Sequence, residues 1–226
     1  FIGSYDKIDC ILYVAKILTE LGKKVLVVDA THKQKARYTV PTISQGRSYV
    51  TEFEGIDVSV GLKNFHLIEQ YLGTDNIQNL YDIALIDVDT AVMFQNFGLY
   101  EAQKNYFVTS FDVYDLKRGL ETLGYIQEPI KITKVFFSRN MLPEEEQYLD
   151  FLAKDYKIVW DEFKIYFPVT IDDLSVIAEN QRIEKIKFKK LSTAYKENLM
   201  FICEEIDNGI RPADIRKIIK NIEKGA

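Results

Sequence analysis

Residues 1–31, FIGSYDKIDCILYVAKILTELGKKVLVVDAT, contain two apolar runs separated by a polar loop and a helix-like segment. The helical spacing of apolar residues begins near Ile8 or Asp9 and ends at Gly22, a typical helix-capping residue. The β-branched run at residues 25–28 predicts a strand that is covered on both faces, with Asp29 at its end. We therefore expect a strand, a loop, a helix and a second strand, in that order.

The rest of the chain alternates between strand-like and helix-like runs. Strands are predicted at residues 81–89, 104–110 and 131–140, one or two more at 156–169, and a hairpin at 48–62. Helices are predicted at residues 67–73, 112–126, 143–156 and within 170–206. Repeated alternation of this kind predicts a doubly wound, mainly parallel α/β sheet with helices on both faces, in a single domain over residues 1–226.

Composition and charge limit the classes of protein to which the chain can belong. The chain has 226 residues, of which 47% are hydrophobic and 28% charged, a balance typical of soluble globular domains. The net charge of −5 argues against a dedicated nucleic-acid binder, although a local basic patch is compatible with it. Cys10 and Cys203 lie in apolar runs, which predicts buried free thiols in a reducing, cytoplasmic compartment. Because the chain begins with Phe1 inside a predicted strand, we expect further residues before it.

Functional sites in such sheets lie at the carboxyl ends of the strands. This rule selects residues 3–9, 29–31, 87–90 and 138–140, which we expect to converge on one crevice. The first of these has the position of a phosphate-binding loop, but it contains a single glycine. A plain β–α turn is the alternative, in which Asp6 or Asp9 caps the helix and Asp29 and Asp87 cap turns. His32 and His66 stand alone, so no metal site and no catalytic residue is assigned.

Three segments resemble the MinD/ParA family of P-loop ATPases, the deviant Walker A (SIMIBI) group. LGKKVLVVDAT at residues 21–31 is similar to the family's second strand, and YDIALIDVD at 81–89 to its Walker B strand. Residues 178–206 resemble its closing helices. The resemblance implies a P-loop fold, with Lys7 at the position of the P-loop lysine and Gly3 at a loop glycine.

The chain also departs from the family pattern. Ile2 stands in place of the signature lysine, and Thr31 in place of the second acid after the second strand. Asp6 replaces a glycine and would repel bound phosphates, while Ile8 replaces the hydroxyl that ligates magnesium. Binding of ATP or ADP is therefore expected to be weak, Mg²⁺ binding doubtful, and ATP hydrolysis absent or very slow. The candidate nucleotide-binding residues are Gly3, Ser4, Tyr5, Asp6, Lys7, Ile8, Asp9, Asp29, Asp87 and Ser138.

This pattern implies a degenerate family member that dimerises and recruits protein partners as a localisation or scaffold component, similar to the TadZ/CpaE group of pilus assembly. The homodimer is expected to place residues 3–9 and 89–97 near its interface. Two alternatives stay open. One is an active ATP-dependent partitioning or positioning switch, and the other is a DNA- or membrane-surface adaptor.

Two basic stretches bear on the adaptor alternative. RIEKIKFKK at residues 182–190 is interrupted by an acid and favours a solvated helix face over a DNA surface. The tail carries Ile215, Ile218, Ile219 and Ile222 on one face of a short helix, with basic residues around them. Such a small apolar stripe predicts modest membrane affinity, and docking on the core or on a partner is an equal alternative. DNA and membrane contacts are therefore not favoured, and contact with the membrane periphery is expected only through partners.

Overall fold

The computed structural model describes residues 1–42, 46–140 and 142–224. Its strands form two sheets, in the orders β2-β3-β1-β4 and β5-β6-β7. All neighbouring strands are parallel except the β2–β3 hairpin. The strands are β1 (Val25–Asp29), β2 (Tyr49–Phe53), β3 (Ile56–Val60), β4 (Ile83–Asp87), β5 (Tyr106–Thr109), β6 (Ile130–Ser138) and β7 (Ile158–Pro168).

Residues 1–3 join the two sheets. Ile2 forms parallel bridges with Val88, just after β4, and with Phe107 in β5. The Ile2 N–H donates to the Tyr106 carbonyl at 2.8 Å, and the Val108 N–H donates to the Ile2 carbonyl at 2.8 Å. The first residues of the chain therefore bridge the β4 edge of one sheet to the β5 edge of the other, in parallel with both.

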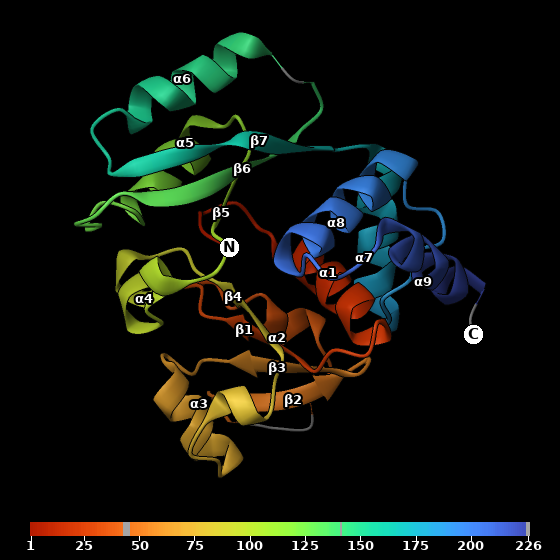
Figure 1. Ribbon diagram of the computed structural model, residues 1–226. Helices are drawn as coiled ribbons and strands as arrows, with labels where there is room; N and C mark the ends of the chain where they lie inside the picture. The colour runs from red at the N-terminus through yellow and green to blue at the C-terminus, as the bar shows by residue number, and fades with distance from the viewer. Residues whose placement is uncertain (43–45, 141, 225–226) are drawn as a thin grey trace.

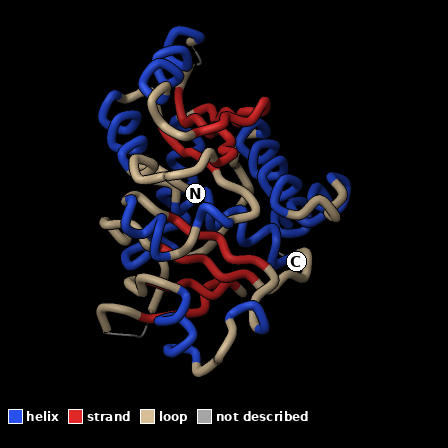
Figure 2. The backbone as a smooth tube through the Cα atoms, turned by 60° about the vertical axis from the view of Figure 1, so that its left-hand side comes forward, coloured by secondary structure: helices blue, strands red, loops and turns tan. Residues whose placement is uncertain are grey.

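Helices cover both faces of these sheets (Figures 1 and 2). They are α1 (Ile8–Glu20), α2 (Ala36–Thr39), α3 (Phe65–Leu72), α4 (Ala91–Asn96), α5 (Val113–Glu121), α6 (Pro143–Ala153), α7 (Ile171–Ile183), α8 (Thr193–Ile206) and α9 (Pro212–Lys224). Several begin at a side chain that accepts from a backbone N–H of the first turn, namely Asn64, Thr90, Asp112, Thr170 and Ser192. These caps satisfy N–H groups that have no partner inside the helix.

Strand alternation builds two hydrophobic cores. Val25 and Val27 of β1 face a core shared with α1, α8 and α9, whereas Leu26 and Val28 face a core shared with α3 to α6. Because β1 is covered on both faces, all of its residues are buried, which explains the continuous apolar run in the sequence. The doubly wound α/β architecture is thereby confirmed.

Some predicted boundaries differ from the structure. Helix α5 ends at Glu121 rather than near residue 126, because the N–H groups of Thr122, Leu123 and Gly124 bond three residues back, as in tight turns. Residues 156–169 contain one strand, β7, which is one of the two possibilities that the sequence left open. The segment expected to be helical over 170–206 is broken after Ile183, where Glu184 adopts a left-handed conformation.

Gly3 is required by the close packing of the opening loop on β5. Its φ is +133°, and a Cβ built there would lie 2.3 Å from the carbonyl oxygen of Val108. Neither condition suits a residue with a side chain. The glycine therefore has a structural reason that holds whether or not the loop binds phosphate.

We predict that Gly3→Ala lowers the free energy of unfolding by about 2–4 kcal/mol, because it combines backbone strain with a clash against a rigid carbonyl. Gly73→Ala is the matched control: Gly73 also has positive φ, but nothing lies within 4 Å of a Cβ built there. That control is expected to cost only about 1 kcal/mol. Urea unfolding of the two variants measures the difference. Equal losses would contradict a role for the contact with Val108.

Candidate functional site

Lys7 ends the opening loop, and its side chain is turned inward. The Nζ atom lies 2.6 Å from Oδ1 of Asp87 and donates to the Gly3 carbonyl at 2.7 Å and, more weakly, to the Tyr5 carbonyl at 3.4 Å. Lys7 is only 2% exposed. An ammonium has three N–H donors, so these three contacts use its whole bonding capacity. The loop lysine is therefore held by the protein itself.

Asp87 and Asp29 end neighbouring parallel strands and stand side by side in register. Burial raises the pKa of Asp87 to about 6, the positive charge of Lys7 opposes this shift, and the nearby charge of Asp29 adds to it. Asp29 accepts hydrogen bonds from the N–H and hydroxyl of Thr31 and from the N–H of Ala36. Asp29 thus acts as a turn cap, one of the two roles the sequence leaves open.

Asp6 and Asp9 share one cation. Lys35 Nζ lies 2.6 Å from Asp6 Oδ2 and 2.7 Å from Asp9 Oδ2. Gln181 of α7 donates to both oxygens of Asp9 at 2.8 and 2.9 Å. These contacts connect the loop and the first turn of α1 to the segment after β1 and to α7.

The remaining loop residues are also bound within the protein. The Ser4 hydroxyl donates to the Asp115 carbonyl at 3.1 Å, and the Tyr5 ring stacks on Phe137 at 5.0 Å. Ile8 is buried in the core at the start of α1, where it offers no oxygen ligand. The cavity that the loop shares with Asp29 and Asp87 has a volume of about 20 Å³. That is room for roughly one water molecule.

Residues 3–9, 29–31 and 87–90 therefore converge as predicted, since they line this cavity or contact its lining residues. Ser138 behaves differently: its hydroxyl donates to the Asn140 carbonyl at 2.8 Å, and it is not among the residues that line this cavity. Lys35 and Gln181 are site residues that were not predicted from the sequence. Lys35 could have been suggested by its position six residues after Asp29, at the end of β1. No local feature of the sequence points to Gln181.

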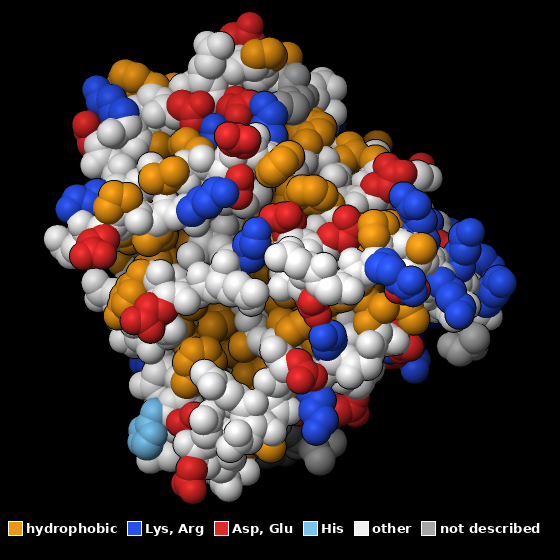
Figure 3. Space-filling view, in the orientation of Figure 1, with side chains coloured by type: hydrophobic (Ala, Val, Ile, Leu, Met, Phe, Trp, Pro, Cys, Tyr) orange, Lys and Arg blue, Asp and Glu red, His pale blue; other side chains and the backbone are white. Residues whose placement is uncertain are grey.

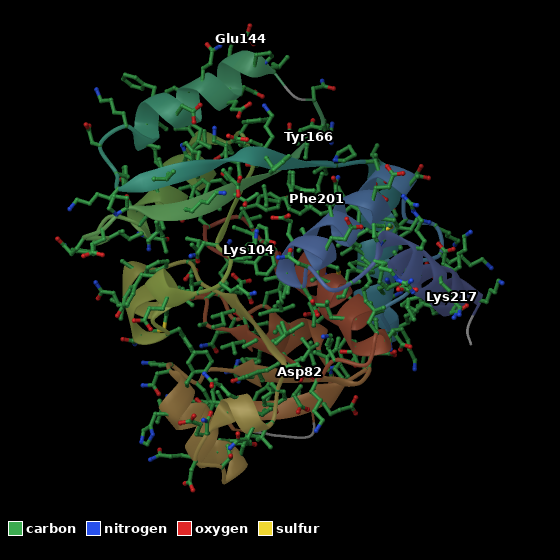
Figure 4. All side chains as sticks on the ribbon, in the orientation of Figure 1. Asp82, Lys104, Glu144, Tyr166, Phe201 and Lys217 are labelled. Carbon is green, nitrogen blue, oxygen red and sulfur yellow. The ribbon has the colours of Figure 1, made fainter. Side chains whose placement is uncertain are left out.

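The two basic stretches lie at one end of the molecule. Lys185, Lys187, Lys189 and Lys190 are exposed in the connection between α7 and α8, rather than on the helix face that the sequence favoured. Three of these lysines line one groove with Lys224 of α9. Lys and Arg side chains gather over α9 in Figure 3, and Figure 4 labels Lys217 there. Acids enter the same groove, since Glu54 lies 3.3 Å from Lys185.

Helix α9 is docked on the core. Ile215 and Ile219 are buried in the hydrophobic cluster that contains α1 and α8, and Ile222 packs against its edge. Lys196 of α8 pairs with Glu223 at 2.8 Å. Most of the apolar stripe predicted for the tail is thus used inside the molecule.

Among the described residues, no helix combines the length and apolar character needed to cross a membrane. Over the same residues, no group of three or more His, Cys, Asp or Glu side chains is placed to hold a metal ion.

No family model and no curated protein sequence matches the chain. Among solved structures, the chain is similar to a protein of Borrelia burgdorferi B31 that is named for plasmid partition and is bound to AMPPNP. The TM-score is 0.46 and the identity 13%, over 95% of this chain and 92% of that one. It is also similar to pNOB8 ParA, with a TM-score of 0.39 and 12% identity over 95% of each chain. For pNOB8 ParA bound to nonspecific DNA, the TM-score is 0.41 and the identity 13%, over 93% of each chain.

We predict that Lys7→Met destabilises the protein strongly at pH 7.5 and much less at pH 5. Removing one partner of a buried ion pair costs about 3–5 kcal/mol when the other stays charged. The folded pKa of Asp87 is already raised to about 6, and loss of Lys7 raises it further. In the variant the folded state therefore takes up a proton before the unfolded state does, and stability falls as the pH rises between the two pKa values.

Urea unfolding of the wild type and the variant at both pH values measures this effect. The double variant Lys7→Met/Asp87→Asn is the control, since it removes both charges and should recover part of the stability lost at pH 7.5. A loss of the same size at both pH values would show that Lys7 contributes packing alone.

Proposed function

We propose that the chain is a single MinD/ParA-type P-loop domain whose nucleotide site is degenerate. In this proposal it serves as a localisation or scaffold component that dimerises and recruits protein partners, for example in pilus or secretion assembly. The observation that carries the proposal is the contact of Lys7 with Asp87. In a working P-loop the lysine at this position binds phosphate, whereas here its ammonium is already paired with Asp87.

Three further features of the site support weak nucleotide binding. The loop cavity is far smaller than a triphosphate. Asp6 in the loop and Asp9 in the first turn of α1 share a single lysine, so an incoming anion meets excess negative charge. Ile8 is apolar where magnesium needs an oxygen. The N-terminal end of α1 still offers unpaired N–H groups, so weak anion affinity is compatible with this geometry.

Exposed apolar side chains near the loop support self-association. Helices α4, α5 and α7 each follow a parallel strand, so they begin at the same edge of the sheet as the loop. Large apolar side chains are exposed at these helix starts: Val92 (58%), Val113 (50%), Tyr114 (66%), Ile171 (74%) and Leu174 (47%). Clusters of this kind commonly mark protein contact surfaces. They favour a homodimer formed through the loop edge.

Calorimetry with ATP, with and without Mg²⁺, tests the nucleotide proposal. We expect dissociation constants of about 1 mM or weaker, little affected by Mg²⁺. Asp6→Gly should strengthen binding, because it removes a repelling charge and leaves Lys35 paired with Asp9. Asp75→Gly, at an exposed acid on another loop, is the control and should change nothing. Robust Mg²⁺-dependent turnover by the wild type would instead support the active ATPase switch.

Sedimentation velocity tests the dimer. We expect association at micromolar protein without nucleotide, and a shift toward monomer in Ile171→Asp and Tyr114→Asp. Both side chains are largely exposed, so these changes should leave the fold intact. Phe151→Asp on α6 is the matched control, since Phe151 is 61% exposed but lies away from the helix starts at the loop edge. A wild-type chain that stays monomeric at high micromolar concentration would contradict the proposed assembly.

A further inference from the structure

A second cavity of about 260 Å³ lies beside the closed loop, between α1, the end of β6 and α7. Three aromatic side chains, Tyr5, Phe137 and Tyr195, line it together with aliphatic groups such as Ile177. The Tyr5 and Phe137 rings are stacked, so their orientation is fixed. The volume is just below the range usual for small-molecule sites, which suits a compact ligand.

The charges around this cavity are mainly negative. Asp6, Asp9 and Asp173 contribute to the lining, and Lys35 is the one cation among the lining residues. Lys35 is already held by both Asp6 and Asp9, and Asp173 accepts from Ser192 and Thr170. The lining thus carries an excess of two negative charges in a partly dry space, which repels anions and attracts cations.

Tyr195 supplies a polar group without a partner. It is 3% exposed, and its hydroxyl makes no hydrogen bond with any residue in the described part of the chain. Burial, with the nearby charges of Cys10 and Asp9 among further causes, raises the pKa of Tyr195 well above its usual value, so the phenol stays neutral. Tyr195 lines the cavity together with Cys10, Asp9 and Tyr5. Unlike the buried, unpaired hydroxyls of Tyr49 and Tyr106, the Tyr195 oxygen is reached by solvent, so a ligand N–H can replace water as its donor.

We propose that this cavity binds a small organic cation that carries N–H donors, of the alkylguanidinium or alkylammonium class. The charged head donates to Tyr195 and is drawn by the carboxylate of Asp9. The faces of Tyr5 and Phe137 add cation–π attraction. The alkyl stem packs against the aliphatic part of the wall near Ile177. This ligand class differs from the weakly bound nucleotide proposed above, and the inference does not depend on that proposal.

Titration calorimetry with butylguanidinium tests it, with butylurea as an uncharged ligand of nearly the same shape. We expect butylguanidinium to bind at least tenfold more tightly than butylurea. Asp9→Asn should weaken butylguanidinium binding about tenfold and leave butylurea unchanged. Tyr195→Phe keeps the ring and removes only the unpaired hydroxyl, and should weaken binding about three- to tenfold. Asp75→Asn, at an exposed acid outside the cavity, should have no effect.

Equal affinity for the two ligands, or no detectable binding of butylguanidinium, would overturn the proposal. Displacement of butylguanidinium by an equal concentration of AMP would also overturn it, because the cavity would then accept an anionic planar ligand. If Asp9→Asn does not fold, the Tyr195→Phe variant still decides: unchanged affinity there would remove the hydroxyl from the site.

Discussion

The buried ion pair between Lys7 and Asp87 is the contact on which the arrangement of the loop edge depends. It joins the end of the opening loop to the end of β4, in a place where neither charge is solvated. An incoming phosphate would have to replace the carboxylate as the partner of the ammonium. Asp87 would then be left unpaired at a position where burial already raises its pKa. The pair therefore opposes phosphate binding even though the lysine that could bind phosphate is present.

The sequence predicts the sheet well because a buried strand is visible locally as an apolar run of residues. A strand covered on both faces needs a continuous apolar run, and β1 shows one. Helix α1 is also predictable from the sequence, because its apolar residues recur at helical spacing and Gly22 follows its end. The convergence of Lys7, Asp29 and Asp87 follows from topology, since parallel strands end at one edge.

Side-chain pairing was less accessible from the sequence, because it depends on residues far apart in the chain. A lysine in a loop can face solvent, phosphate or a carboxylate, and periodicity does not distinguish these cases. The contact of Gln181 with Asp9 joins α7 to α1 and left no local signal. The break after Ile183 was missed for a related reason: Ile186 and Phe188 are buried, so the connection between α7 and α8 has the apolar content of a helix.

The place of residues 1–3 in the sheet has a consequence for the order in which the chain acquires structure. Both strands that flank these residues, β4 and β5, come much later in the chain. The unit β2-β3-β1-β4 can pair early, but its β4 edge stays open until β5 is available to enclose the first residues. Contacts between such distant segments slow folding, and an open strand edge promotes aggregation while it lasts. We therefore expect this junction between the two sheets to form late in folding.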